Sequence, residues 1–329
     1  MTIPSLVLLL QGVSHAAGGG PPSTMEAAGP AAASIARLSA VLIAAAVVVF
    51  VIVMALLVWP MLRRTESAAD GPRMIDKRRW EFRWIVVGGA IVPMLILAAV
   101  FALSLAGMRA EEKPASPYRI DVIGRQWWWE IRYPNEGVVT ANEIHIPTGR
   151  PVRIHLESAD VIHSFWVPQL QGKTDAITGQ VNETWIQSDA PGVYRGECAE
   201  FCGMQHAHMA FVVIAEAPNV YDAWLAAQAQ PSIAPTDPAA SAGQRVFMTK
   251  SCAFCHSIRG TGAAAHVGPD LTHVASRATL ASATIDNSPD NLTRWIEHPD
   301  KLKPGTKMPP VSLDPPSLRA LVTYLETLR

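Results

Sequence analysis

Two long apolar stretches place the strongest constraint on how this 329-residue chain can fold. One runs from Ala36 to Leu62, and the other runs from Trp84 to Met108. A helix needs about 20 apolar residues to cross a bilayer, and both stretches exceed that length. The low charged content, 17% against 49% hydrophobic residues, agrees with membrane spans. We therefore expect a transmembrane helical hairpin over residues 36–109, rather than the buried hairpin of a soluble protein.

The segment between these stretches carries a cluster of basic residues. The cluster consists of Arg63, Arg64, Arg73, Lys77, Arg78, Arg79 and Arg83. Basic loops stay on the cytoplasmic side of a membrane, so this loop is expected there and everything after Arg109 outside. A formal net charge of −1 gives no indication of a nucleic-acid partner.

Residues 1–35 form an N-terminal segment without a clear fold signal. The apolar run from Leu6 to Leu10 precedes the small residues at 14–18, as in a signal peptide, but no Lys or Arg stands before it. The pattern leaves cleavage open. Residues 18–34 are rich in Gly, Pro and Ala, and we expect them to be irregular.

Residues 110–218 change to the alternating pattern of β-strands. Tyr118–Ile123, Val152–Leu156 and Phe211–Ile214 alternate between apolar and other residues, and turn sequences follow Pro147 and Ala190. Short alternating strands separated by regular turns predict an all-β sandwich or barrel.

Within this β region, soft metal ligands are concentrated in one short segment. Cys198, Cys202, His206 and Met209 lie there, and His163 precedes them. Thiolate and thioether ligands favour copper, zinc or iron–sulfur over hard cations. A mononuclear blue-copper site needs only one Cys, so a second thiolate suggests a binuclear copper centre. A zinc site, a disulfide and a pair of buried thiols remain alternatives at this point.

The sequence motif of this segment, Cys-x-Glu-x-Cys-x-x-x-His-x-x-Met, resembles the corresponding motif of subunit II of the haem–copper cytochrome c oxidases. The segments Asp-x-x-His-Ser at 160–164 and Gly-Lys-Thr-Asp-Ala-Ile at 172–177 strengthen the resemblance, which covers roughly residues 36–217. It implies a cupredoxin-like sandwich with a mixed-valence CuA centre. The implied ligands are bridging Cys198 and Cys202, terminal His163 and His206, and, as weak axial ligands, Met209 and the carbonyl of Glu200. The Glu200 carboxylate would also reach magnesium at the interface with subunit I.

A run of three tryptophans, Trp127 to Trp129, also matches the family segment Gly-x-Gln-Trp-x-Trp. On a strand, Trp127 and Trp129 would share one face and Trp128 would point to the other. Core packing is the plain interpretation. The resemblance implies that Trp127 receives electrons from a docked cytochrome c. His145 and His155 are interpreted as paired sheet residues, and His208 as a non-ligand.

Residues 219–240 are expected to form an amphipathic helix followed by a Pro/Ala linker, and residues 241–329 form a second redox domain. Cys252-Ala253-Phe254-Cys255-His256 reads as a c-type haem attachment site rather than a thioredoxin-like pair. The segment resembles an all-α class I cytochrome c, in which Met308 is the expected sixth ligand. His266, His273 and His298 are its rivals. In that family the carbonyl of Pro269 would accept a hydrogen bond from the His256 ring.

Together these parts predict a multi-domain membrane protein: a helical hairpin, a cupredoxin-like sandwich and a cytochrome c domain. They resemble subunit II of a caa3-type oxidase in a bacterial cytoplasmic membrane, with the copper and haem domains in the periplasm. Electrons would pass from cytochrome c or another donor through haem c and CuA to subunit I, where oxygen is reduced to water and protons are translocated. Other oxidase subunits would be further partners, and fusion would raise the donor's effective concentration at the copper.

Two departures from the family pattern bear on this interpretation. Val86 stands where the family has a Glu of the proton-uptake route, and Thr178 and Gln180 replace a Pro and an Arg. The alternatives are the electron-accepting subunit of a CuA-type nitric oxide reductase, or a stand-alone membrane-tethered electron carrier.

Overall fold

The computed structural model describes residues 23–62, 74–109 and 113–329. The chain divides into two compact units. One comprises residues 33–112, and the other comprises residues 1–32 together with 113–329.

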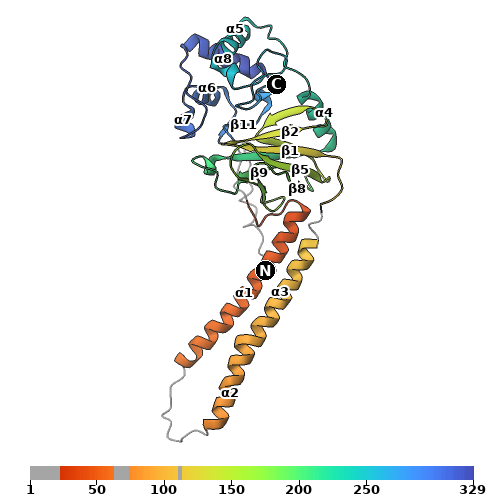
Figure 1. The fold of residues 1–329 in the computed structure, drawn as a ribbon, viewed down its shortest axis with the longest axis vertical. Coiled ribbons are helices and arrows are strands. Elements are labelled where there is room, and N and C mark those ends of the chain that lie inside the picture. Colours follow the sequence, from red (N-terminus) through yellow and green to blue (C-terminus); the bar gives the residue numbers. More distant parts are fainter. Residues whose placement is uncertain (1–22, 63–73, 110–112) are drawn as a thin grey trace, which may run out of the picture. The chain divides into compact units, whose positions relative to one another are not determined.

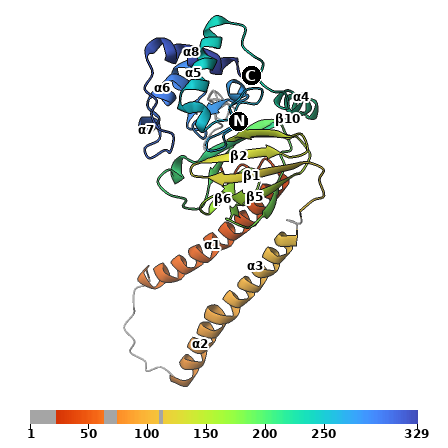
Figure 2. The ribbon, with the colours of Figure 1, turned by 45° about the horizontal axis from the view of Figure 1, so that its top comes forward.

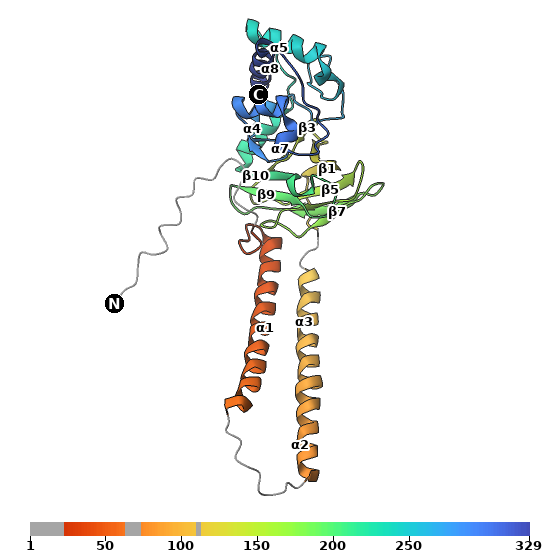
Figure 3. The same ribbon diagram turned by 90° about the vertical axis from the view of Figure 1, so that its left-hand side faces the viewer.

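The smaller unit consists of helices, drawn as long rods in Figure 3. Its elements are α1 (Pro30–Leu62), α2 (Met74–Val86), the π-helical turn η1 (Val87–Ile91) and α3 (Val92–Arg109). Pro30–Leu62 and Trp80–Gly107 are long and apolar enough to cross a membrane, and neither buries its apolar window within the protein. The predicted pair of apolar helices is confirmed.

The helix boundaries differ from the sequence prediction at two places. Helix α1 begins at Pro30, within the stretch expected to be irregular, because Pro suits the first helical position and the alanines after it favour helix. Lys77 to Arg83 lie in α2 rather than in a loop, since no Gly or Pro interrupts this segment. Arg63, Arg64, Arg73 and the signal-peptide segment lie outside the described residues.

The π-helical turn η1 ends two residues before Pro93. Proline lacks an N–H, and its ring clashes with the carbonyl four residues earlier, here that of Gly89. A proline and a π turn are both recognised sites at which a helix bends, and here they lie next to each other.

The larger unit begins with a β-sandwich (Figure 1). Its two five-stranded sheets have the orders β3-β2-β1-β5-β8 and β4-β10-β9-β6-β7. The strands are β1 (Arg119–Arg125), β2 (Trp128–Tyr133), β3 (Val138–Ala141), β4 (Glu143–Pro147), β5 (Val152–Ser158), β6 (His163–Trp166), β7 (Thr174–Ala176), β8 (Asn182–Ile186), β9 (Gly192–Cys198) and β10 (Ala210–Glu216). The three predicted strands correspond to β1, β5 and β10. Most pairs are antiparallel, but β1 pairs parallel with β5, and β10 with β4.

The sandwich core is aromatic at the end that carries the metal ligands. Trp129, Phe165 and Phe211 are buried and pack edge-to-face or stacked on one another. Trp129 also packs edge-on against the ring of His163. This close packing gives the ligand loops a rigid base.

A helical module, residues 238–329, completes the larger unit and adjoins the sandwich (Figure 2). Helix α4 (Pro218–Gln228) precedes it, close to the predicted helix. The module contains α5 (Pro238–Thr249), η3 (Ser251–Phe254), η4 (Val274–Ser276), β11 (Thr279–Leu280), β12 (Ile285–Asp286), α6 (Pro289–Glu297), α7 (Pro299–Leu302) and α8 (Pro315–Thr327). The predicted linker is shorter than expected, because Asp237 caps α5 by accepting a hydrogen bond from the Ala240 N–H.

Helices α5 and α8 cross in close contact at Gly243. A Cβ added there would lie 1.9 Å from the carbonyl oxygen of Ala320, so only glycine permits this backbone approach.

We predict that Gly243→Ala lowers the stability of the helical module by about 1–3 kcal/mol, despite alanine's better helix propensity. Thermal unfolding of the haem-loaded chain, followed by haem absorbance, measures this. The matched control is Gly262→Ala, whose new Cβ would meet only the flexible Met248 side chain at 3.4 Å. Equal melting temperatures for the two variants would contradict the tight crossing.

Candidate metal centre and haem pocket

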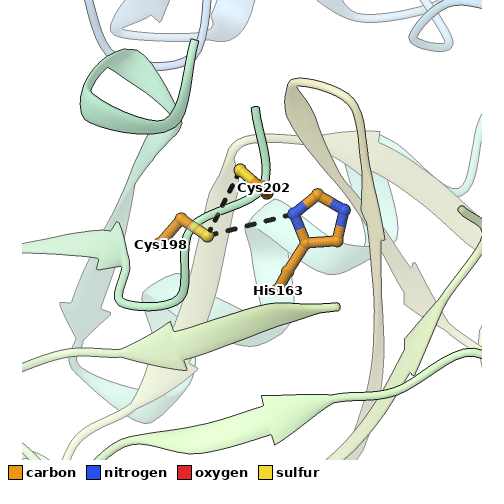
Figure 4. A group of neighbouring side chains, drawn as sticks. All are labelled: His163, Cys198 and Cys202. Carbon is orange, nitrogen blue, oxygen red and sulfur yellow. Dashed lines mark hydrogen bonds between the residues drawn. The ribbon is translucent and has the colours of Figure 1, made fainter. Parts of the chain in front are cut away.

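The loops at one end of the sandwich bring all the sequence-predicted copper ligands together. His163 begins β6, Cys198 ends β9, and the chain then passes through Cys202 and η2 (His206–His208) before entering β10. The ligand atoms of His163, Cys198 and Cys202 lie within 4.8 Å of one another, with the sulfurs and the ring nitrogen facing each other (Figure 4).

The distances within this group suit soft-metal coordination. The two Sγ atoms are 3.7 Å apart, and both cysteines are free and buried. His163 Nδ1 lies 3.9 Å from Cys198 Sγ, and His206 Nδ1 lies 3.8 Å from Cys202 Sγ. Met209 Sδ is 3.8 Å from Cys202 Sγ, and the Glu200 carbonyl oxygen is 3.2 Å from Cys198 Sγ. A donor set of two thiols, two imidazoles and a thioether fits copper better than zinc, for which a thioether is a poor ligand.

The His163 ring is held in position by its surroundings. Asp160 Oδ1 accepts a hydrogen bond from Nε2 at 2.8 Å, which leaves Nδ1 toward the sulfurs. On the other side, Gly124 approaches the ring so closely that an added Cβ would be 2.6 Å from its Cδ2. The Asp160 carboxylate also accepts hydrogen bonds from the backbone N–H groups of Gln126 and Val161.

Hydrogen bonding within the cluster separates the pKa values of the two thiols. The hydrogen bond with Cys202 lowers the pKa of Cys198, and the bond with His163 adds to this effect. The same contact raises the pKa of Cys202, as does its burial. One thiolate therefore forms readily, whereas the second needs the positive charge of a bound metal.

The electrostatic pairing of His163 with Asp160 changes both pKa values. Burial lowers the pKa of His163, but hydrogen bonds to Cys198 and Asp160 more than offset this and leave it raised. Burial opposes ionisation of Asp160, yet its bonds to His163 and to two backbone N–H groups leave its pKa lowered. Asp160 is thus a stable carboxylate that orients the ring.

Trp127 does not lie on a strand, contrary to the sequence expectation. Strand β1 ends at Arg125 and β2 begins at Trp128, so Trp127 lies in the turn between them. Its indole Nε1 donates to the carbonyl of Cys202 at 3.0 Å. The amide of Gln126 donates to the same carbonyl at 2.8 Å. The turn therefore bonds directly to the loop that carries the thiols.

A pocket in the helical module fits a covalently attached haem. Its lining includes Cys252, Cys255, His256 and Met308, surrounded mostly by apolar side chains. His256 Nδ1 donates to the Pro269 carbonyl at 2.7 Å, as predicted. Burial lowers the pKa of His256, which favours the neutral ring needed for metal ligation.

The geometry of the pocket favours Met308 over the rival sixth ligands. His266, His273 and His298 do not line the pocket. His273 instead directs Nε2 to the carbonyl of Gln230 at 2.9 Å. Gly268 lies against the His256 ring, where an added Cβ would be 2.6 Å from Cε1.

Arg277 in the pocket wall was not singled out from the sequence. Its Nε is buried without a hydrogen-bond partner, while another nitrogen donates to the Asp270 carbonyl. A buried unpaired guanidinium N–H is costly, and a haem carboxylate would satisfy it. A lone arginine in a polar segment gives no periodicity or motif from which this position could be recognised.

Gln126, Trp127 and Trp128 of the sandwich also line this pocket. Trp127 therefore borders the haem pocket on one side and bonds to the metal-ligand loop on the other.

The remaining histidines have the structural roles expected of them. His145 stacks on Trp224 at 3.8 Å between ring centroids and pairs with Glu216. His155 pairs with Glu183 at 3.0 Å. His208 is exposed in η2. It is the ring of His206, not that of His208, that lies beside Cys202 Sγ.

These features define a class of redox protein in which a membrane-anchored cupredoxin-like domain with a soft-metal centre carries an attached c-type cytochrome. The family described as cytochrome c oxidase subunit II, periplasmic domain, matches residues 136–216, and the cytochrome c family matches residues 240–329. The crystal structure of the periplasmic domain of cytochrome oxidase subunit II of Bradyrhizobium japonicum is similar over 35% of this chain and 96% of that chain, with 29% identity and a TM-score of 0.35.

Relatives named cytochrome c oxidase subunit 2 are similar over most of the chain. Cytochrome c oxidase subunit 2 of Alkalihalophilus pseudofirmus is 37% identical over 76% of this chain and 73% of its own length. The subunit 2 of Bacillus sp. (strain PS3) is 32% identical over 81% of this chain and 79% of its own. The chain belongs to the cytochrome c oxidase subunit II family, and its fused cytochrome c domain matches the caa3 type.

We predict that Asp160→Asn weakens copper binding by about 10- to 100-fold, because the carboxylate that orients His163 is lost. Competition with a copper chelator measures this affinity. Glu157→Gln, a change at an exposed carboxylate on β5, is the matched control and should leave the affinity unchanged. Equal affinities for both variants would show that Asp160 does not support the site.

Proposed function

We propose that this subunit passes electrons from cytochrome c or another donor through its own haem c to a CuA centre, and on to oxidase subunit I. Subunit I would reduce oxygen to water and couple this to proton translocation. The observation that carries the proposal is the position of Trp127, which borders the haem pocket and bonds to Cys202.

The proposed copper ligands are the residues that converge at the end of the sandwich. Cys198 and Cys202 would be the bridging ligands, His163 and His206 the terminal ligands, and Met209 and the Glu200 carbonyl the weak axial ligands. When bound, a binuclear copper pair takes up and releases one electron. The chain's part is to hold this donor set in a rigid, buried arrangement, which the aromatic core and Asp160 support.

The haem would be attached to Cys252 and Cys255, with His256 and Met308 as axial ligands. Trp127 would receive electrons from this module. Its hydrogen bond to the Cys202 carbonyl provides a short bonded connection to the copper-ligand loop.

The domain division proposed from the sequence places the membrane hairpin at 36–109, the CuA domain at 110–218 and the cytochrome c domain at 241–329, after residues 1–35 and a helix and linker at 219–240. The hairpin would anchor the chain in a bacterial cytoplasmic membrane, with both redox domains in the periplasm. Subunit I and other oxidase subunits would be its partners. The exposed Glu200 side chain would reach magnesium at the interface with subunit I.

This chain lacks the Glu that the family usually has on its proton-uptake route. Val86, the last residue of α2, stands at that position and cannot carry a proton. We infer that this position of the chain takes no part in proton uptake.

The proposal is tested by electron paramagnetic resonance of the oxidised, metal-loaded chain, with copper counted by mass spectrometry. We expect one unpaired electron shared equally by two coppers, at two coppers per chain. A single-copper signal, or zinc in place of copper, would contradict it. Turnover of oxygen rather than nitric oxide by the purified complex separates the oxidase from a nitric oxide reductase, and purification without subunit I would favour a stand-alone carrier.

We predict that Met308→Ala lowers the haem c reduction potential by on the order of 0.1 V, since axial ligands set potentials over a range of about 0.8 V. The variant should also bind an added ligand such as imidazole at the open sixth position. Redox titration followed by haem absorbance measures both effects. Met248→Ala, in the same module but outside the pocket lining, is the control and should change neither. An unchanged potential in Met308→Ala would exclude Met308 as the ligand.

A further inference from the structure

The helical module contacts the sandwich through a short hairpin. This docking hairpin, residues 278–286, contains strands β11 and β12. Ser282 Oγ donates to the Trp127 carbonyl at 2.9 Å, and Arg195 of β9 donates to the Ala283 carbonyl at 3.1 Å. Ala283 is also buried against Ala210 and Val212 of β10. The hairpin therefore joins the module to the strands that flank the copper ligands.

Glu143 of β4 provides the charged part of this contact. The side chain is 4% exposed, and its Oε1 accepts hydrogen bonds from the backbone N–H of Ala278 at 2.6 Å and of Thr279 at 3.1 Å. The cation of Arg277, also in the helical module, attracts the same carboxylate. Charge-assisted hydrogen bonds to backbone N–H groups are stronger than neutral ones, and a buried carboxylate depends on them.

The docking hairpin adopts a conformation that its own sequence does not favour. Ala281, Ser282 and Ala283 have φ values of 54°, 59° and 55°, in the left-handed region. Residues with a Cβ avoid this region, so such a conformation persists where surrounding contacts determine it. The contacts that the sandwich makes with this hairpin can hold it in the left-handed conformation.

Two donors of the helical module, one of them on the docking hairpin, meet at Trp127. The Trp127 carbonyl accepts from Ser282 and also from Lys303 Nζ, at 3.3 Å. Lys303 is 3% exposed. Two side chains of the helical module thus converge on one backbone oxygen of the residue that borders both redox sites.

We infer that Glu143 is a positioning residue that locks the cytochrome module onto Trp127 through the docking hairpin. The haem module is then a fixed electron donor rather than one that swings on its linker. Glu143 itself is neither a copper ligand nor a lining residue of the haem pocket. Its partners Thr279 and Arg277 do line that pocket, and Glu143 acts through them and through the hairpin backbone. This inference rests on the proposed electron path, but its structural part can be tested without any electron transfer.

The first test is hydrogen–deuterium exchange of the full, metal-loaded chain in detergent. In Glu143→Ala, the amides of residues 278–283 should exchange at least tenfold faster than in the unchanged chain. Glu143→Gln should give an intermediate rate, because its amide oxygen still accepts hydrogen bonds. Glu183→Ala is the matched control, since this β8 carboxylate pairs with Arg153, His155 and Lys113 and not with the hairpin. Unchanged exchange in Glu143→Ala, with copper bound normally, would overturn the inference.

The second test is the rate of intrachain electron transfer from haem c to copper after flash reduction of the haem. The rate should fall at least severalfold in Glu143→Ala and recover partly in Glu143→Gln. An unchanged copper resonance spectrum and an unchanged haem reduction potential show that both sites are intact. Faster exchange without a slower rate would show that Glu143 stabilises the hairpin but does not position the donor. If the unchanged chain transfers no electron from haem to copper, the proposed function is wrong. The exchange result would still show whether Glu143 holds the docking hairpin against the sandwich.

Discussion

The two-sided bonding of Trp127 is the interaction on which the arrangement of the larger unit depends. Its indole N–H binds the carbonyl of Cys202, and its own carbonyl accepts from Ser282 and Lys303. One residue is therefore bonded to the copper-ligand loop and to the cytochrome module at once. A hydrogen-bonded contact of this kind keeps two redox sites in a constant relation, which a flexible tether alone would not.

The ligands of the metal centre lie on loops that are supported by the close-packed core of the sandwich. Its ligands lie on loops at the end of β6, β9 and η2, yet each adjoins a strand end of a close-packed sandwich. Trp129 packs against the His163 ring from the core, and Gly124 leaves just enough space beside it. Packing and Asp160 thus fix the ring orientation through the protein's own contacts, so the site is preorganised.

Two charged side chains, Glu143 and Lys303, are buried at the junction between the sandwich and the cytochrome module. Burial lowers the pKa of Lys303 to about 7 and raises that of Glu143, so both charges are costly where they lie. Hydrogen bonds across the junction offset these costs: Glu143 accepts from the Ala278 N–H of the cytochrome module, and Lys303 donates to the Trp127 carbonyl of the sandwich. Polar groups of this sort favour one specific docking arrangement over a general apolar association.

The sequence by itself determined the parts whose chemistry or length allows few solutions. Long apolar stretches predict membrane helices, Cys-x-x-Cys-His indicates a haem, and the set of soft ligands favours a soft metal. The tertiary structure alone decided the turn position of Trp127 and the roles of Glu143 and Arg277. The Glu143 contacts join residues 135 and 136 positions apart, and local patterns carry no information about pairs so distant. Only folding brings such groups together, because their pairing depends on how the sandwich and the cytochrome module meet.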